Sequence, residues 1–267
     1  MSDAAPPLRN ARATFDAAAL GRGLVIPGLI VIAWTAFTHG DLISSNLLVP
    51  IEGIVALPFT DEAGVQLWPA LFASIVRLVL GFAIGAAAGI ALGGLMGASR
   101  LADRAVGPSF NALRQITLFA WIPLLTAWFG NGDMPKIVYV AMSAFFPAAL
   151  NSYIGLRNIS VQYFEVASVL RLSRLTRIRR LLLPGALPSI FVGLQIALIS
   201  AWLGTVSSEY AMGNGRGLGG FLLEGRGQFR MDVVVLGVVV LALVGYLINA
   251  GCSKIFRRLL VWQGNSK

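Results

Sequence analysis

Residues 68–99 form an apolar run of 32 residues whose only charged side chain is Arg77. About 20 apolar residues in a helix are enough to cross the roughly 30 Å hydrocarbon core of a bilayer. Charged residues make up only 12% of the whole chain, whereas about 25% is usual for soluble domains. The sequence therefore predicts an all-α polytopic membrane protein.

Five further apolar runs are separated by polar or basic connections, which predicts a single domain of six transmembrane helices over residues 23–256. Within the third span, Pro123 is expected to bend the helix, because proline leaves a backbone carbonyl without its donor. Pro50 and Pro58 are expected to break the connection after the first span. Residues 1–22 and 257–267 are interpreted as tails. The predicted spans are residues 24–38, 68–99, 111–133, 136–156, 187–212 and 233–256.

The distribution of lysine and arginine orients these spans. Six spans place both termini on one side, and 16 of the cationic residues fall on that side. The opposite side carries only Lys136, Arg216, Arg226 and Arg230. Because connections that stay in the cytoplasm are enriched in lysine and arginine, both termini are expected to be cytoplasmic.

Several kinds of chemistry are disfavoured by the residues present. Cys252 is the only cysteine and His39 the only histidine, so no metal site and no histidine-based catalytic triad is predicted. The net charge of +9 lies in short segments between apolar runs, as orientation signals do, and nucleic-acid binding is not expected. We assign no catalytic residue and expect no enzyme activity.

Two glycine patterns bear on nucleotide binding. Residues 215–220, GRGLGG, fit the spacing G-x-G-x-x-G, but no strand precedes them, and we interpret the match as accidental. The sequence contains no P-loop motif. The chain is therefore expected to bind no cofactor itself, and any nucleotide energy must come from a partner.

Glycines recur every four residues in the second span, which places them on one helix face. Small residues let two helix backbones approach closely in a membrane. We interpret this glycine ladder as a packing surface rather than a substrate site. Its members are Gly81, Gly85, Gly89, Gly93 and Gly97.

Charged residues inside spans are costly and face protein or water. Arg77 either pairs structurally or lines an anion path, and we favour the structural role. Glu209, near the outer end of the fifth span, either pairs with a neighbouring donor or faces a translocation cavity. The residues assigned to a candidate translocation path are Arg77, Pro123, Ser143, Asn151 and Glu209.

One long basic segment, residues 155–190, interrupts the apolar runs and contains a single acid, Glu165. Residues 165–170 and 172–183 favour two short helices. The segment is either a surface helix whose arginines touch anionic lipid head groups or a docking element for another protein. Pro184 and Pro188 are expected to break the chain where it re-enters the membrane.

The run FEVASVLRLSRLTRIRRLLLPGALPSIFVGLQIALISAW resembles the signature of binding-protein-dependent ABC importer permeases, an E-A-A run followed by a glycine and then I/L-L-P. Other pieces resemble the permeases for aliphatic sulfonates, taurine, nitrate and bicarbonate: ALRQITLFAWIPLLTAWFGNGD, GALPSIFVGLQIAL and GRGLGGFLLEGRGQFRMDVVV. The resemblance covers about residues 48–262.

This resemblance implies a type I ABC importer fold in the bacterial inner membrane, with a cytoplasmic coupling segment at about residues 157–183. The implied partners are a second permease copy, two ATPase subunits that hold ATP and Mg, a periplasmic or lipid-anchored solute-binding protein, and membrane lipids. The implied cargo is a small anion of the sulfonate, taurine or nitrate type. The implied coupling residues are Glu165, Val166, Ala167, Val169, Leu170, Arg171, Leu172, Ser173 and Arg174.

The sequence departs from the family pattern at two positions. Arg171 stands where the signature glycine is expected, which suggests a different turn or a modified ATPase contact. Thr117 stands where the family usually has proline. The alternatives to a permease are a secondary transporter driven by an ion gradient, which usually has an internal repeat and intramembrane acids, and a membrane scaffold without transport.

Overall fold

The computed structural model describes residues 17–39, 49–213 and 215–259, and all regular structure in these ranges is helical. The predicted tails therefore lie largely outside the described residues. The helices are α1 (Ala17–His39), α2 (Ile51–Thr60), α3 (Glu62–Val65), α4 (Leu67–Ala98), α5 (Arg100–Leu113), η1 (Leu118–Trp121), α6 (Ile122–Phe129), α7 (Asp133–Arg157), α8 (Val161–Val169), α9 (Arg174–Arg177), η2 (Ile178–Leu182), α10 (Leu183–Met212), α11 (Leu218–Gly227) and α12 (Met231–Leu259).

The membrane-spanning elements confirm the predicted fold class. Within the described residues, 4 segments are long and apolar enough to cross a bilayer, and there are 5 if α5 and the helical pair η1–α6 count as one span. The 4 segments contain α4, α7, α10 and α12. The remaining predicted span, residues 24–38, falls within α1 and is not among those counted.

The third span breaks at a different place from the one expected. α5 and η1–α6 meet at an angle of 91°. The break lies at residues 114–117, whereas Pro123 lies in the first turn of α6. Proline is tolerated at that position because the first amides of a helix have no acceptor within it. The bend predicted at Pro123 is therefore wrong, and the chain turns before the apolar part begins.

Of the other breaks expected at proline, the structure confirms the one at Pro50. Pro50 is the N-cap of α2 and so lies at a helix boundary, whereas Pro58 lies inside that helix. Pro184 lies in the first turn of α10, and Pro188 lies inside the same helix, which continues to Met212. The segment before α10 is a five-residue π-helix, η2, so the basic segment leads into the span without a break.

Close backbone contact between α4 and α7 forms the centre of the bundle. A Cβ atom added to Gly85 or Gly93 would lie within 3.0 Å of the carbonyl oxygen of Ala141 or Ala149 on α7. A Cβ atom would likewise crowd α7 at the three other members of the ladder: Gly81, Gly89 and Gly97. The ladder thus lies along α7 over the C-terminal half of α4.

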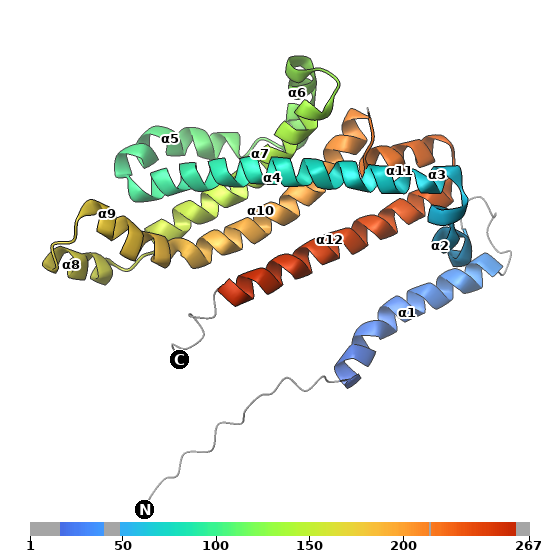
Figure 1. Ribbon diagram of the computed structural model, residues 1–267, viewed down its shortest axis with the longest axis horizontal. Helices are drawn as coiled ribbons and strands as arrows, with labels where there is room; N and C mark the ends of the chain where they lie inside the picture. Colours follow the sequence, from blue (N-terminus) through green and yellow to red (C-terminus); the bar gives the residue numbers. More distant parts are fainter. Residues whose placement is uncertain (1–16, 40–48, 214, 260–267) are drawn as a thin grey trace, which may run out of the picture.

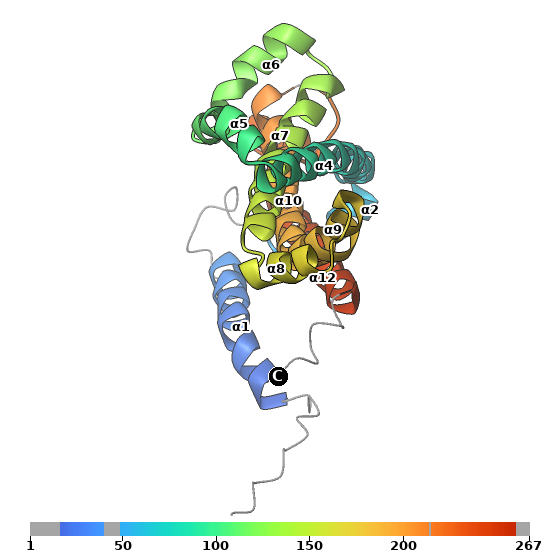
Figure 2. The same cartoon turned by 90° about the vertical axis from the view of Figure 1, so that its left-hand side faces the viewer.

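The bundle has two distinct ends. Figure 1 shows α8 and α9 at one end and α2, α3 and α11 at the other. α4, α7, α10 and α12 run between these ends, and α5 with α6 forms a bent arm that projects from the bundle in both views (Figures 1 and 2). We call the two ends the α8 end and the α11 end.

Gly93 and Gly94 provide a matched test of the packing. Gly93→Ala is expected to lower the free energy of unfolding by about 1–3 kcal/mol, because its methyl group overlaps the α7 backbone. Gly94→Ala meets nothing within 4 Å and is expected to be neutral or stabilising by up to about 1 kcal/mol. Thermal unfolding of both variants in detergent measures the difference. Equal stability of the two would contradict the close α4–α7 contact.

Candidate functional site

The first candidate site is the coupling segment, in which α8 and α9 are held together. Arg177 of α9 donates to Ser168 Oγ at 3.0 Å, and its guanidinium lies 5.9 Å from the centre of the Phe164 ring. Ser173 accepts a hydrogen bond from the backbone amide of Thr176 and so caps the short helix α9. The side chain of Arg174 lies outside the described residues. These contacts make the two helices one unit that leads directly into η2.

The outward face of α8 is apolar. Tyr163, Val166, Val169 and Leu170 are 61%, 57%, 82% and 63% exposed, and at 100° per residue they share one half of the helix surface. Ala167, at the edge of this half next to Tyr163, is only 3% exposed. Glu165 is exposed at the edge of this face. An apolar helix face rimmed by charge is typical of a surface that packs into a groove of a partner.

Arg171 forms the turn after α8 in a left-handed conformation, with φ of 46°. Its amide donates to Ser168 O and the amide of Leu172 donates to Ala167 O, at 3.0 and 3.1 Å. This pair of hydrogen bonds is a Schellman motif, in which glycine is preferred at the left-handed position. Glycine would therefore suit this turn, but the residue that adopts the left-handed conformation here is Arg171.

The second candidate site is a buried ionic cluster near the α11 end. Arg77 is 4% exposed and Glu209 is 1% exposed. Arg77 Nη1 donates to Glu209 Oε1 at 2.6 Å, and its Nη2 donates to Asp133 Oδ1 at 2.7 Å. The cluster joins α4, α7 and α10. Structural pairing and a place on a translocation path were the alternatives for Arg77 and Glu209. In the structure the two side chains pair with each other.

Glu209 also holds the start of α11. Its Oε2 accepts from the amide of Gly219 at 3.0 Å, while Ser74 Oγ donates to the carboxylate at 2.8 Å and accepts from the amide of Leu218 at 2.9 Å. The first amides of a helix lack partners within it, and Gly217, the N-cap, offers no side chain. A carboxylate from α10 and a hydroxyl from α4 therefore cap α11.

This arrangement explains two of the glycines in residues 215–220, the GRGLGG run that fits a nucleotide-binding spacing. Gly217 has φ of 158°, and a Cβ there would overlap the Glu209 carboxylate. A Cβ on Gly219 would lie within 3.0 Å of the α10 backbone at Val206 and Tyr210. The motif lets the chain pass close to a buried carboxylate, rather than close to a nucleotide phosphate.

Three participants in the cluster were missed from the sequence. Lys136 is 1% exposed, and Ser74 and Asp133 contact the ion pair directly. Ser74 precedes Arg77 by three residues and Asp133 precedes Lys136 by three, so each pair shares a helix face. That spacing is the only local signal that could have identified them.

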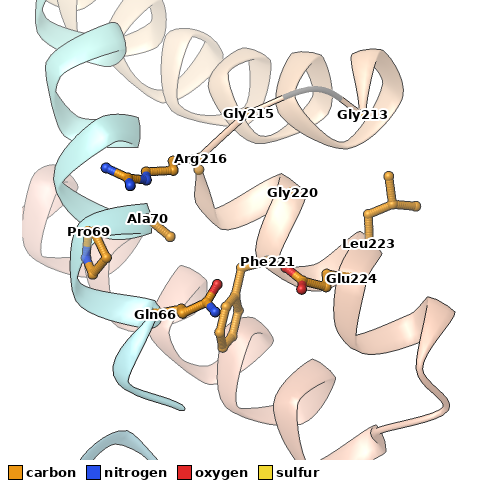
Figure 3. A pocket seen from close by; sticks show the side chains of 11 residues that line it. Gln66, Pro69, Ala70, Gly213, Gly215, Arg216, Gly220, Phe221, Leu223 and Glu224 are labelled. Carbon is orange, nitrogen blue, oxygen red and sulfur yellow. The ribbon is translucent and has the colours of Figure 1, made fainter. Parts of the chain in front are cut away.

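A pocket of about 780 Å³ lies beside the cluster, between the start of α4 and the chain from Gly213 to Glu224. Figure 3 shows Arg216 from the α10–α11 connection and Glu224 from α11 around this space, with Gln66, Ala70 and Phe221. The pocket thus presents both a cation and a carboxylate. Within the described residues, no group of three His, Cys, Asp or Glu side chains could hold a metal ion.

The other residues assigned to a translocation path lie elsewhere. Ser143 is 3% exposed and donates to Tyr139 O; it faces α10 so closely that a Cβ on Gly204 would meet it. Asn151 donates to Pro147 O and packs against Gly193. Both lie between α7 and α10, while Pro123 is exposed on α6. The structure does not bring these three to the ionic cluster, and the path stays a prediction.

Charged residues also fix the start of α12. Arg230 contacts Asp61, at the junction of α2 and α3, and donates to Asp232 at 2.6 Å. The Arg230 guanidinium holds the pKa of the Asp61 carboxyl below its usual value, and the two carboxylates raise the pKa of Arg230. Phe229, just before Arg230, has φ of 56° and repeats the turn geometry of Arg171.

Comparison with known proteins identifies the family. Residues 81–260 match the family described as binding-protein-dependent transport system inner membrane component. The chain belongs to this family. It is a multi-pass membrane protein, the permease subunit of an ABC importer, which decides against the secondary transporter and the scaffold.

Individual relatives of the permease support this assignment. It is 33% identical over 245 residues to the aliphatic sulfonates transport permease protein SsuC of Bacillus subtilis (strain 168), across 91% of this chain and 88% of the relative. It is 37% identical over 205 residues to the nitrate import permease protein NrtB of Leptolyngbya laminosa, across 76% and 73%.

A solved structure agrees with the fold of the permease. A chain of the inward-facing MetNI methionine ABC transporter superposes with a TM-score of 0.62, over 72% of this chain and 95% of that one. At 23% sequence identity, this likeness concerns the fold. The family also makes this permease a transport component that works with an ATPase and a solute-binding protein.

The ion pair gives a first test of the cluster. Glu209→Gln leaves Arg77 buried without its nearest anion, and breaking a buried pair in this way costs about 3–5 kcal/mol. Asp133→Asn is the control, because Asp133 is 67% exposed and an exposed pair contributes about 0–1 kcal/mol. Chemical denaturation in detergent measures both variants. A loss for Asp133→Asn as large as that for Glu209→Gln would show that Glu209 is not the main partner.

The turn after α8 gives a second test. Arg171→Gly removes the strain of a left-handed non-glycine residue, and we expect a gain of about 0.5–1 kcal/mol in local stability. Hydrogen exchange at the α8 amides should slow by about two- to fivefold. Leu170→Gly, at φ of −74°, is the control and should speed exchange. Unchanged or faster exchange in Arg171→Gly would mean that the arginine side chain stabilises the turn.

Proposed function

We propose that this permease imports a small anion and that α8 is the surface on which a separate ATPase docks. The observation that supports the docking role most directly is the exposed apolar face of α8, a helix that the hydrogen bond from Arg177 to Ser168 joins to α9. Lone apolar side chains are common on protein surfaces, but a contiguous patch marks an interaction site. In this proposal Val166, Val169 and Leu170 form the centre of the contact, and Glu165 with the polar residues that follow, up to Arg174, forms its rim.

The proposed orientation places the α8 end in the cytoplasm. The charge count supports it, because 16 cations lie on the side of the termini and four on the other. ATP and Mg would be held by the ATPase in the same compartment. The α11 end, with its large pocket, would then face the solute-binding protein.

The proposed mechanism uses the permease to convert movement, with no chemistry of its own. ATP binding draws two ATPase subunits together, and each pushes on the α8 that it holds. The α8–α9 unit continues into η2 and then into α10, a helix of 30 residues that carries Glu209 in its last turn. A displacement at one end of α10 therefore reaches the cluster at the other, as alternation between two rigid arrangements requires.

The substrate class is proposed from the relatives named above, whose names specify sulfonates and nitrate. Arg77 does not supply the selectivity, because Glu209 and Asp133 occupy its guanidinium. Arg216 lines two of the outer pockets and is exposed, so it is the cation best placed to meet an arriving anion. A second permease copy would complete the path between two bundles.

Val166 tests the docking role. Val166→Asp puts a charge into a contact that excludes water, and we expect the affinity for the ATPase to fall by at least about thirtyfold, as for a central interface residue. Copurification with the coexpressed ATPase measures it. Val161→Asp, on the same helix but rotated away from the apolar face, is the control. Normal ATPase binding by Val166→Asp would place the docking surface elsewhere.

A further inference from the structure

A second pocket, of about 290 Å³, lies where the coupling segment joins the bundle. Its walls come from the last turns of α4, the end of α7 and the chain through η2 into α10. Ile90, Leu156, Ile178 and Leu182 are among the lining residues. Its one hydroxyl, from Ser152, is buried and donates to Ala148 O at 2.7 Å. The walls therefore offer apolar contact and nothing for a polar ligand to bind.

The α4 wall of this pocket is unusually open. A Cβ added to Gly94 would meet nothing within 4 Å, although Gly93 beside it is packed tightly against α7. A glycine in open space gives up apolar contact area that a larger side chain would supply. In a membrane the medium that reaches such a space is the hydrocarbon of lipid tails.

Each of the three walls carries an arginine close in sequence to its lining residues. Arg100 lies two residues after Ala98 of α4, Arg157 follows Leu156 of α7, and Arg179 lies in η2 between the lining residues Ile178 and Leu182. Arg157 is paired with Asp103. Arg100 and Arg179 are exposed, as is Arg180. Exposed arginines thus lie close in sequence to the lining residues of this apolar pocket.

We propose that this pocket binds an acyl chain of an anionic phospholipid whose phosphate head group lies against Arg100 and Arg179. Apolar walls accept the chain, and cationic side chains close to a membrane surface attract anionic lipid by about fivefold each. Basic pockets between transmembrane helices are used for such lipids. The proposal depends on the membrane location of the chain and is independent of its substrate.

The lipid would act at the connection between the coupling segment and the span. Ile178 and Leu182 belong to the π-helix that joins α9 to α10, and Leu156 ends the helix that packs along α4. A chain lodged among them contacts both sides of that connection. We therefore expect bound anionic lipid to raise the stability of the α8–α9 unit on the bundle.

Gly94→Leu is the direct test, because a Cβ at this position meets nothing within 4 Å and the rest of the side chain would occupy the pocket that Gly94 lines. Native mass spectrometry of the purified full-length permease, titrated with phosphatidylglycerol or phosphatidylcholine, measures binding. We expect Gly94→Leu to lose most of the phosphatidylglycerol bound by the wild type at equal concentration. Gly251→Leu on α12, where a Cβ also meets nothing within 4 Å, is the matched control and should keep it.

A second variant separates the head group from the chain. Arg100→Gln with Arg179→Gln should reduce the preference for phosphatidylglycerol over phosphatidylcholine by about 25-fold, at about fivefold per cation, and leave phosphatidylcholine binding unchanged. The proposal is overturned if Gly94→Leu binds phosphatidylglycerol like the wild type, or if Gly251→Leu loses as much. It is also overturned if Gly94→Leu changes only the oligomeric state, because the pocket would then be a contact between two copies of the chain.

Discussion

The pair formed by Arg77 and Glu209 is the interaction on which the α11 end of the permease depends. Both side chains are almost fully buried, and an isolated charge in such surroundings would be strongly destabilising. Glu209 satisfies Arg77 and the start of α11 at once, since its carboxylate accepts from the guanidinium, a hydroxyl and a backbone amide. Gly217 follows from this need, because a side chain there would displace the carboxylate, and Gly219 lets the start of α11 lie against the α10 backbone.

The centre of the bundle and its α8 end are built on other principles. Between α4 and α7 the contact is backbone against backbone, and it leaves little freedom for one helix to slide past the other. At the α8 end, by contrast, large apolar side chains are left exposed on a unit held by a few polar contacts. In the proposed mechanism, this rigid centre would transmit a displacement of the α8 end to the α11 end.

Features that depend on local sequence could be predicted, and features that depend on distant partners could not. The apolar runs and the spacing of the ladder place α4 within a residue of its observed bounds and identify its packing face. The salt bridge of Arg77 could not be assigned, because Glu209 is 132 residues away. The break predicted at Pro188 is absent, because a membrane helix can continue where one backbone hydrogen bond is lost.

In the candidate sites too, features that depend on local sequence could be predicted and others could not. The segment that contains α8 and α9 could be singled out from its signature and its charge, and its coupling role stays a prediction. The left-handed turn at Arg171 could not be predicted from its side chain, because the hydrogen bonds of the Schellman motif need only the backbone of residue 171. The break at residues 114–117 was assigned to Pro123, since proline is the usual cause and these residues include none.

The π-helix at Ile178–Leu182 has a consequence for the geometry of transmission. A π-turn accommodates one more residue per hydrogen-bonded ring than an α-turn, and one residue corresponds to about 100° of rotation about a helix axis. Converting this turn to α-helix would swing α8 around the axis of α10 while every covalent neighbour stays in place. In the proposed mechanism, the junction between the α8–α9 unit and α10 would therefore act as a rotary joint whose two settings differ by a single residue of register.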